Sequence, residues 1–477
     1  MDYTQEQKDI INYTPEIGET IKVQAFAGTG KTSTLRAYTG KRPNRKFLYV
    51  CFNKAIQEYA AKVFGPNTDC KTIHSLAWSR YAGYYKNKLV QSLKATTVND
   101  VLGYNDYVKS RFALDTLQRY LISADHEINE THIPHMAKFL YRKNKEELVK
   151  AASDIWEIMT DPEDDNIGIV HDGYLKLFQL SEPKLSKYDT ILIDEAQDVN
   201  PITYDVLSRQ VCSHLLVGDP HQSIYKFRGA EDIMSKIKSA RSFYLTQSFR
   251  FSKSIGILAN LILWTFKGET KKVKGHAGRQ GHIGKVTGNH TVICRTNAAV
   301  FELASSMLSF TKIGLVGGIN TYRFGELLES YYLYDGQIEK ITTPYIKAFN
   351  TFKAMKQFAE DVEDVELTGR VKLVERYKGS IPVLLHKIRE ATVSVDTAEV
   401  IFSTAHKIKG LEFPSVRVNN DFVKLVNSKG QIIDPEDITP EEINLIYVAC
   451  TRSLGNLELP PKIVEFVKAL RADRMKN

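Results

Sequence analysis

The sequence has few of the features that place proteins outside the cell or in a membrane. Its 477 residues include only five cysteines, widely scattered and without a C-x-x-C pair. This spacing excludes an obvious zinc or iron–sulfur cluster and a disulfide framework, and it favours a reducing compartment. The first residues lack the basic and apolar regions of a signal peptide. The longest apolar stretch, 255–266, is too short to span a bilayer, so we expect no membrane partner.

Internal repeats and low-complexity tracts are also missing from the chain. The apolar share of 43% and the charged share of 25% are those of an ordinary globular protein. A chain of this length is too long to fold around one hydrophobic core, so we expect about two to four domains. We therefore expect a soluble intracellular protein, nuclear if it comes from a eukaryotic cell and otherwise cytoplasmic.

Acidic residues are absent from one stretch, 271–285, which carries five lysines and arginines. The whole chain has 64 basic and 56 acidic residues, a net charge of +8. This mild excess is compatible with nucleic-acid binding but does not establish it. The basic stretch has two interpretations, a contact with nucleic acid or a solvated loop.

A phosphate-binding loop is predicted near the start of the chain. Residues 21–26 are typical of a buried strand, and residues 33–38 of the first turns of a helix. In a turn of this kind, backbone N–H groups and the positive end of the helix dipole point at one anion. The pattern therefore predicts binding of a nucleoside triphosphate by Ala25, Phe26, Ala27, Gly28, Thr29, Gly30, Lys31 and Thr32.

Four positions of this loop carry its chemistry. Gly28 and Gly30 permit the tight backbone path, Lys31 can reach the outer phosphates, and Thr32 can hold Mg²⁺. The strict pattern has glycine at the position of Ala25, which is the departure from it in this chain.

Apolar strands alternate with helices in two parts of the chain, which is typical of parallel sheets with right-handed crossovers. Helices are predicted at 4–13 with Thr4 as the N-cap, at 55–63, from Thr72 or Ser75 onward, and at 252–266. Strands are predicted at 21–26, 46–52, 189–195, 214–219 and 242–245, and then at 291–295, 400–403 and 416–418.

Two long stretches rich in helix formers, 79–185 and 316–394, interrupt this alternation. The sequence therefore predicts an α/β protein with two lobes, each carrying a mostly helical insertion. The expected limits are 1–78 with 186–253 for lobe 1A, 79–185 for insertion 1B, 254–315 with 395–477 for lobe 2A, and 316–394 for a reduced insertion 2B.

Two acids, Asp194 and Glu195, stand at the C-terminal end of the strand predicted at 189–195. Ligands bind at that edge of open parallel sheets. We expect Asp194 to hold Mg²⁺ together with Thr32, and Glu195 to orient or deprotonate the attacking water. Phosphoryl transfer needs little beyond such positioning and positive charge around the γ-phosphate.

Residues 217–230, VGDPHQSIYKFRGA, resemble motif III of the UvrD/Rep group of superfamily 1A DNA helicases. The other motifs of that group occur in the family's order over nearly the whole chain. They are Gln7 and the segments 25–32, 50–54, 71–77, 191–198, 247–250, 295–297, 403–413 and 445–452. The resemblance implies two RecA-like P-loop NTPase lobes, and members of the group often carry alanine at the position of Ala25.

Within that group, several stretches look most like the helicase core of the F-box DNA helicases. These are 49–54, 317–320 and 420–424. The chain begins a few residues before the first motif, which leaves no room for an F-box. We therefore expect no ubiquitin-ligase partner acting through an F-box.

The resemblance assigns roles around ATP and Mg²⁺. It implies that Gln7 reads the adenine edge, Phe249 stacks on the base and Glu412 contacts the ribose. Gln222 would link the γ-phosphate to the DNA site. An arginine that reaches the γ-phosphate from the second lobe contributes about 10³–10⁵ in rate and couples hydrolysis to motion. The catalytic set implied in this way is Lys31, Asp194, Glu195, Gln222, Arg250 and Arg452.

The resemblance also implies a track for single-stranded DNA. Stacking of a base on an aromatic ring contributes about 1–3 kcal/mol and tolerates any sequence. Phe52 and Phe227 have an alternative interpretation as core aromatics. Rings for stacking would come from Phe52, Tyr225 and Phe227, and contacts to backbone or bases from Asn53, His74, Arg228, Arg295 and His406. No Cys/His cluster accompanies the two histidines, which argues against a metal site.

Three functions agree with the sequence. The first is an ATP-driven motor that moves 3′ to 5′ along single-stranded DNA and separates duplexes at junctions, acting as a monomer. The second is a translocase that mainly strips proteins from DNA. The third is an ATP-gated DNA-binding module without turnover, against which the complete catalytic set argues. The family further suggests roles in repair, recombination and replication.

Overall fold

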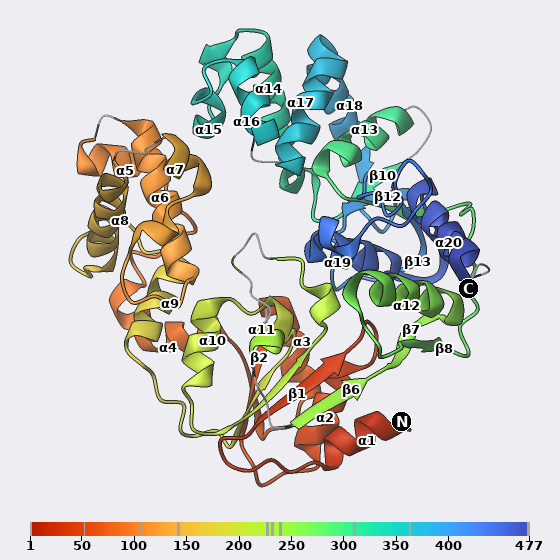
Figure 1. Ribbon diagram of the computed structural model, residues 1–477. Coiled ribbons are helices and arrows are strands. Elements are labelled where there is room, and N and C mark those ends of the chain that lie inside the picture. The colour runs from red at the N-terminus through yellow and green to blue at the C-terminus, as the bar shows by residue number, and fades with distance from the viewer. Residues whose placement is uncertain are drawn as a thin grey trace. The chain divides into compact units, whose positions relative to one another are not determined.

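The computed structural model describes residues 2–51, 53–104, 106–140, 144–225, 229, 233–237, 241–308, 312–361 and 364–474. The chain divides into two compact units, Met1–Ala25 with Gly30–Leu245, and Phe26–Thr29 with Thr246–Asn477. Each unit contains a six-stranded sheet in which all neighbouring strands are parallel (Figure 1). The predicted α/β class with two parallel sheets is confirmed.

The sheet of the first unit has the strand order β3-β2-β4-β5-β1-β6. Its central strands β2, β4 and β5 are buried at every position, as expected where helices cover both faces of a parallel sheet. The strands are β1 (Thr20–Ala25), β2 (Phe47–Cys51), β3 (Thr68–Thr72), β4 (Thr190–Ile193), β5 (Ser213–Gly218) and β6 (Arg241–Leu245).

Several helices of the first unit, among them α1 and α4, begin at a side chain that caps them. In α1, the Thr4 hydroxyl accepts from the backbone N–H of Gln7, and the Gln7 side chain accepts from the N–H of Thr4. At the start of α4, the Thr72 hydroxyl accepts from the backbone N–H of Ser75. The helices near the sheet are α1 (Gln5–Asn12), α2 (Lys31–Gly40), α3 (Lys54–Val63), α4 (Ile73–Tyr85), α10 (Pro201–Ser208) and α11 (Ile233–Lys236), with short 3₁₀ turns η2 (Ala196–Asp198) and η3 (Pro220–Gln222).

The stretch between β3 and β4 is helical, as predicted. It contributes buried residues such as Leu117, Ile155 and Leu175 to a core that continues into the sheet at Ile191 and Leu216. Its elements after α4 are α5 (Ala95–Leu102), α6 (Tyr107–Ile122), η1 (Glu130–His132), α7 (His135–Leu140), α8 (Lys145–Thr160) and α9 (His171–Leu180).

The sheet of the second unit has the strand order β11-β10-β12-β9-β13-β14, and β7 and β8 form a separate parallel pair. Its predicted strands correspond to β9, β12 and β13, which lie side by side. The strands are β7 (Gln247–Ser252), β8 (Lys274–His276), β9 (His290–Cys294), β10 (Ile313–Leu315), β11 (Thr392–Val393), β12 (Val400–Thr404), β13 (Phe413–Val418) and β14 (Ser453–Glu458).

Between β10 and β11 the chain of the second unit is helical, also as predicted. Its elements there are η5 (Ile319–Tyr322), α14 (Phe324–Tyr334), η6 (Ile338–Lys340), α15 (Pro344–Lys347), α16 (Phe352–Asp361), α17 (Val365–Tyr377), η7 (Lys378–Ser380) and α18 (Ile381–Ala391). The remaining helices are α12 (Lys253–Lys267), α13 (Asn297–Met307), η8 (Pro435–Asp437), α19 (Pro440–Cys450) and α20 (Pro461–Arg474).

All five cysteines are free thiols. Among the residues that the structure describes, no cluster of three or more His, Cys, Asp or Glu side chains is suited to a metal ion. No helix in this part of the chain combines the length and the apolar character needed to cross a membrane.

A buried histidine in the first sheet predicts loss of stability in mild acid. His214 of β5 is 6% exposed, and its Nε2 lies 2.8 Å from the Leu207 carbonyl oxygen. Burial lowers the pKa of His214 below its ordinary value. The unfolded chain therefore binds the proton first, so this contribution is complete above pH about 6.5 and is lost as the pH falls below it.

We expect the variant His214→Leu to lose less unfolding free energy than the wild type between pH 7.5 and 5.5. Urea unfolding at a series of pH values measures this difference. Equal losses in both proteins would show that His214 does not titrate differently in the folded state.

Candidate active site

The predicted phosphate loop connects β1 to α2 through two glycines with positive φ. Gly28 has a φ of +73° and Gly30 a φ of +79°, values that residues with a side chain rarely adopt. A Cβ at Gly28 would also collide with Cβ of Arg250 and lie 2.7 Å from Oγ of Ser248. The tip of the loop therefore has no space for any residue other than glycine at position 28.

The loop tip, Phe26–Thr29, belongs to the second unit and is bonded there to two segments. The Ser248 hydroxyl donates to the Ala27 carbonyl at 2.8 Å, and the Phe249 N–H donates to the Gly28 carbonyl at 2.8 Å. The Ala27 N–H donates to the phenol oxygen of Tyr447 at 3.2 Å. Ser248 and Tyr447 lie within the motifs at 247–250 and 445–452, but the sequence predicts no role for either.

In the first unit, the side chains that follow the loop meet the acids at the end of β4. The Lys31 ammonium lies 3.0 Å from Oε2 of Glu195. The Thr32 hydroxyl donates to Oδ2 of Asp194 at 3.3 Å. Glu195 has a φ of +51°, a strained conformation for a residue other than glycine that costs about 1–3 kcal/mol and is common at active sites. Four of the predicted residues are thus brought together.

The charges of this cluster shift one another's pKa values. Burial alone would lower the pKa of Lys31, but the carboxylates of Glu195, Asp194 and Asp219 raise it, so the ammonium stays charged. Burial raises the pKa of Asp194, the nearby Glu195 carboxylate raises it further, and Lys31 opposes the rise. One cation thus stands among three carboxylates, an arrangement suited to a site that receives a metal ion and a phosphate chain.

The oxygen atoms of Thr32 and Asp194 fit Mg²⁺ chemically. A hydroxyl and a carboxylate are hard oxygen donors, which Mg²⁺ prefers, and it commonly takes one or two protein ligands beside phosphates and water. The 3.3 Å separation of the two donor atoms places both at one point of the site.

A buried chain of hydrogen bonds extends from Glu195 to the segment after β5. The Gln197 amide nitrogen donates to Oε2 of Glu195 at 2.6 Å, and its Oε1 accepts from the Asp219 N–H at 3.0 Å. The Gln222 amide in turn donates to Oδ2 of Asp219 at 2.7 Å. Gln197 is fully buried and Gln222 is 4% exposed. This chain connects the predicted base, Glu195, with Gln222, which is predicted to link the γ-phosphate to the DNA site.

We expect Gln197→Leu to lower the unfolding free energy by about 1–3 kcal/mol, because the buried Asp219 N–H loses its acceptor. It also lowers kcat, since Glu195 loses a donor that orients it. Urea unfolding and steady-state ATPase assays measure the two effects. In a double-mutant cycle with Glu195→Gln, residues in one network couple by about 0.5–3 kcal/mol. Additive effects would contradict the hydrogen-bond chain.

Gln7, the predicted reader of adenine, is held from two sides. It is 3% exposed, its Oε1 accepts from the Thr4 N–H at 3.0 Å, and its Nε2 donates to the Thr34 hydroxyl at 3.1 Å. Thr34 in turn donates to the Gly30 carbonyl at 2.9 Å. Gln7 is therefore coupled through one residue to the backbone of the phosphate loop.

In the second unit, Arg250 and Glu412 lie together. Nε of Arg250 is 2.6 Å from Oε1 of Glu412, and Nη1 of Arg250 is buried without a hydrogen-bond partner among the described residues. A buried guanidinium nitrogen without an acceptor can donate a hydrogen bond to an ion or to a water molecule. Phe249 is 38% exposed, as a residue that stacks on a base requires.

Arg452 is 1% exposed, with Nε donating to the Val448 carbonyl at 3.0 Å and Nη2 to the Thr451 hydroxyl at 3.3 Å. Its guanidinium is thus oriented by the end of α19, the helix that also carries Tyr447. The orientation depends on the helix backbone as well as on side chains.

Two of the residues predicted to contact DNA in the first unit are bonded to other residues of the chain. Asn53 is exposed and caps α3 by accepting from the Ile56 N–H at 2.9 Å. Nε2 of His74 on α4 lies 2.9 Å from Oδ1 of Asp172 on α9. Tyr225 is half-buried after η3.

In the second unit, Nη2 of Arg295 lies 2.7 Å from Oε1 of Glu442 on α19, and His406 is half-buried in the turn after β12. Phe52, Phe227 and Arg228 lie outside the described residues, so the choice between stacking and core aromatics at Phe52 and Phe227 stays open.

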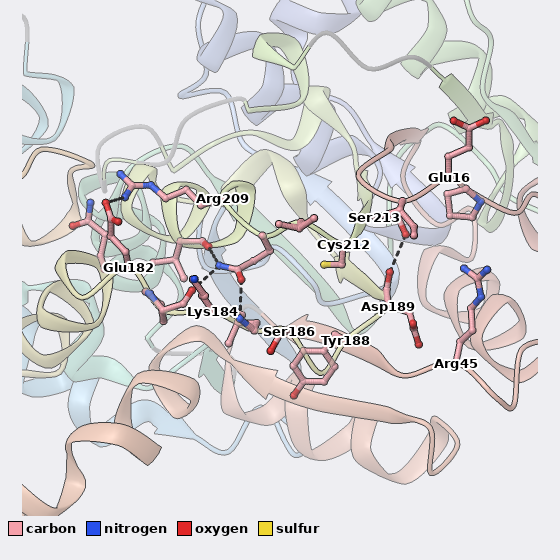
Figure 2. A pocket seen from close by; sticks show the side chains of 18 residues that line it. Glu16, Arg45, Glu182, Lys184, Ser186, Tyr188, Asp189, Arg209, Cys212 and Ser213 are labelled. Carbon is pink, nitrogen blue, oxygen red and sulfur yellow. Dashed lines mark hydrogen bonds and ion pairs between the residues drawn. The ribbon is translucent and has the colours of Figure 1, made fainter.

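A cavity of about 600 Å³ lies at the N-terminal ends of β4 and β5 (Figure 2). The acids Asp194 and Glu195 follow the other, C-terminal end of β4. The walls of the cavity include Tyr188, Arg209 and Cys212, and Arg209 forms an ion pair with Glu182 at 2.6 Å. None of the predicted site residues lines this cavity. It is therefore separate from the cluster around Lys31.

Comparisons with known proteins agree with the motifs. Residues 3–241 match the model of the UvrD/REP helicase N-terminal domain. The chain is 36% identical to F-box DNA helicase 1 of Gallus gallus over 94% of this chain and 48% of the relative. It is 32% identical to F-box DNA helicase protein 1 of Schizosaccharomyces pombe over 97% of this chain and 58% of the relative.

A shorter stretch of the chain is 40% identical to a probable DNA helicase II homolog of Mycoplasma pneumoniae, over 17% of this chain and 12% of the relative. The chain spans about half the length of the curated F-box helicases that it matches, 48% and 58%. The family model covers half of the chain, in the part that holds the phosphate loop and the acids of β4. The chain belongs to the UvrD/Rep helicase family.

Proposed function

We propose that this protein is an ATP-driven motor that moves 3′ to 5′ along single-stranded DNA and separates duplexes. The observation that carries the proposal is the cluster of Lys31, Thr32, Asp194 and Glu195, joined by contacts of 3.0 and 3.3 Å at the end of a parallel sheet. Phosphoryl transfer depends on such positioning. The names of the two long relatives, both DNA helicases, support DNA as the substrate.

Each residue of the cluster has a proposed role. Lys31 binds the outer phosphates of ATP, and Glu195 takes the proton of the attacking water. Thr32 and Asp194 hold Mg²⁺, which neutralises charge on the phosphates when it is bound. Gln197 keeps the Glu195 carboxylate turned toward Lys31, consistent with its 2.6 Å hydrogen bond.

The remaining nucleotide contacts are proposed from the family resemblance. Gln7 recognises adenine, Phe249 stacks on the base and Glu412 contacts the ribose. Arg250 and Arg452 stabilise the charge that develops on the γ-phosphate. The buried Nη1 of Arg250, which has no hydrogen-bond partner among the described residues, supports this role for Arg250.

The DNA track is likewise proposed, with Asn53, His74 and Tyr225 in the first unit and Arg295 and His406 in the second. We also propose the predicted limits of the two RecA-like lobes and their helical insertions, action as a monomer at single-strand/duplex junctions, and a role in repair of replication and recombination intermediates.

Duplexes with a 3′ or a 5′ single-stranded tail test the proposal. We expect strand separation of the 3′-tailed duplex in the presence of ATP, and none with the variant Lys31→Ala. Opening of the 5′-tailed duplex alone would contradict the direction of movement. If neither duplex opened while streptavidin was displaced from a biotinylated single strand, the protein would be a stripping translocase.

A further inference from the structure

The carboxylate of Asp194 is held by a tyrosine on the neighbouring strand. The hydroxyl of Tyr49, on β2, donates to Oδ2 of Asp194 at 2.5 Å. The same oxygen accepts from the Thr32 hydroxyl at 3.3 Å, and Oδ1 accepts from the Glu195 N–H at 2.9 Å. Both carboxylate oxygens are thus fixed by protein donors.

The pairing of β2 with β4 explains why the tyrosine reaches this acid. Tyr49 stands opposite Leu192 in the parallel register. Residues two apart on a strand face the same side of the sheet, so Leu192 and Asp194 share a face with Tyr49. The long phenol ring extends along that face to the strand end, a diagonal neighbour within reach of an aromatic side chain.

The ring of Tyr49 has apolar surroundings, and its hydroxyl meets the Asp194 carboxylate and the Thr32 side chain. The residue is fully buried in a cluster with Val23 and Leu35, and its ring centroid lies 4.6 Å from that of Phe64. Phenylalanine would serve such packing equally well. Burying a hydroxyl costs free energy unless it is hydrogen-bonded. Packing does not require the phenol oxygen, whereas the hydrogen bond to Asp194 does.

We propose that Tyr49 is a positioning residue for Asp194 and thereby strengthens the binding of the magnesium–nucleotide complex. This inference rests on the proposed function, in which Asp194 holds Mg²⁺. Tyr49 itself touches neither metal nor nucleotide. It keeps Oδ2 of Asp194 directed toward the Thr32 hydroxyl, so the carboxylate does not need to be ordered when the metal enters.

The effect is measured as the ratio of the ADP dissociation constant in EDTA to that in Mg²⁺, obtained by calorimetric titration. Loss of a hydrogen-bonded partner of a ligating carboxylate typically weakens metal affinity 10–100-fold. We expect Tyr49→Phe to reduce the ratio by about 10-fold. The dissociation constant in EDTA stays at the wild-type value, because the ring and its packing are retained.

Tyr38→Phe is the matched control. Tyr38 belongs to the same apolar cluster and is 1% exposed, and its hydroxyl has no hydrogen-bond partner among the described residues. Its removal leaves the ratio unchanged. A Tyr49→Phe protein that bound ADP more weakly in both solutions, with the same ratio as the wild type, would overturn the positioning role and show a merely structural one.

Asp194→Asn separates this inference from the proposed function. We expect it to abolish the gain in ADP affinity that Mg²⁺ provides. If the gain survived in Asp194→Asn, the assignment of Asp194 to Mg²⁺ would be wrong. If the gain disappeared in Asp194→Asn but was unchanged in Tyr49→Phe, only the role of Tyr49 would be wrong.

Discussion

The variant Glu195→Gln hydrolyses ATP with a kcat about 10²–10⁴-fold below that of the wild type, the typical contribution of a general base. Glutamine preserves the shape of the side chain at a backbone position already strained at a φ of +51°. It removes the charge that stands 3.0 Å from the Lys31 ammonium and accepts no proton from water. Binding of ATP is retained, because the phosphate loop and Lys31 are unchanged.

Steady-state turnover and the dissociation constant of a non-hydrolysable ATP analogue separate the two effects. Glu163→Gln is a suitable control, because Glu163 is exposed in the turn between α8 and α9. A kcat within tenfold of the wild type for Glu195→Gln would mean that another group activates the water. Loss of analogue binding would instead show that Glu195 acts by ordering Lys31.

The variant Gly28→Ala loses about 10²-fold in kcat/KM for ATP, the cost typical of displacing a catalytic group by about 1 Å. The φ of +73° at position 28 disfavours alanine, and the new methyl group collides with Arg250 and crowds Ser248. The loop tip and the strand β7 have to move apart. The hydrogen bonds from Ser248 to Ala27 and from Phe249 to Gly28 are strained or lost as a result.

Gly40→Ala provides the matched control for this substitution. Gly40 ends α2, the helix that follows the same loop, and a Cβ there meets nothing within 4 Å. Alanine at this position leaves kcat/KM unchanged and is neutral or mildly stabilising, since it favours the helix. A Gly28→Ala enzyme as active as Gly40→Ala would show that the loop tip is not confined by β7.

The phosphate loop and the acids of β4 were predictable because each depends on local sequence. An apolar run, a turn with two glycines and a helix start determine the loop, and the C-terminal edge of a parallel sheet determines where Asp194 and Glu195 lie. The caps formed by Thr4 and Thr72 follow from the same local rules. The strands that the sequence did not indicate are polar or short, as β3 (TDCKT) and β10 (IGL) are.

Contacts between distant segments were not predictable in the same way. The hydrogen bond from Tyr49 to Asp194 depends on the pairing of β2 with β4, which are joined by more than a hundred residues. The sequence pattern does not distinguish Tyr49 from its apolar neighbours in the strand predicted at 46–52. Likewise, Gln197 extends a motif, but only the fold shows that its amide joins Glu195 to Asp219.

ATP hydrolysis with and without single-stranded DNA decides whether this site drives a motor on DNA. We predict that saturating single-stranded DNA raises kcat severalfold, that RNA activates poorly, and that Lys31→Ala abolishes the stimulated rate. A turnover that is the same with and without DNA, in a protein that still binds ATP, would show that the site does not drive such a motor.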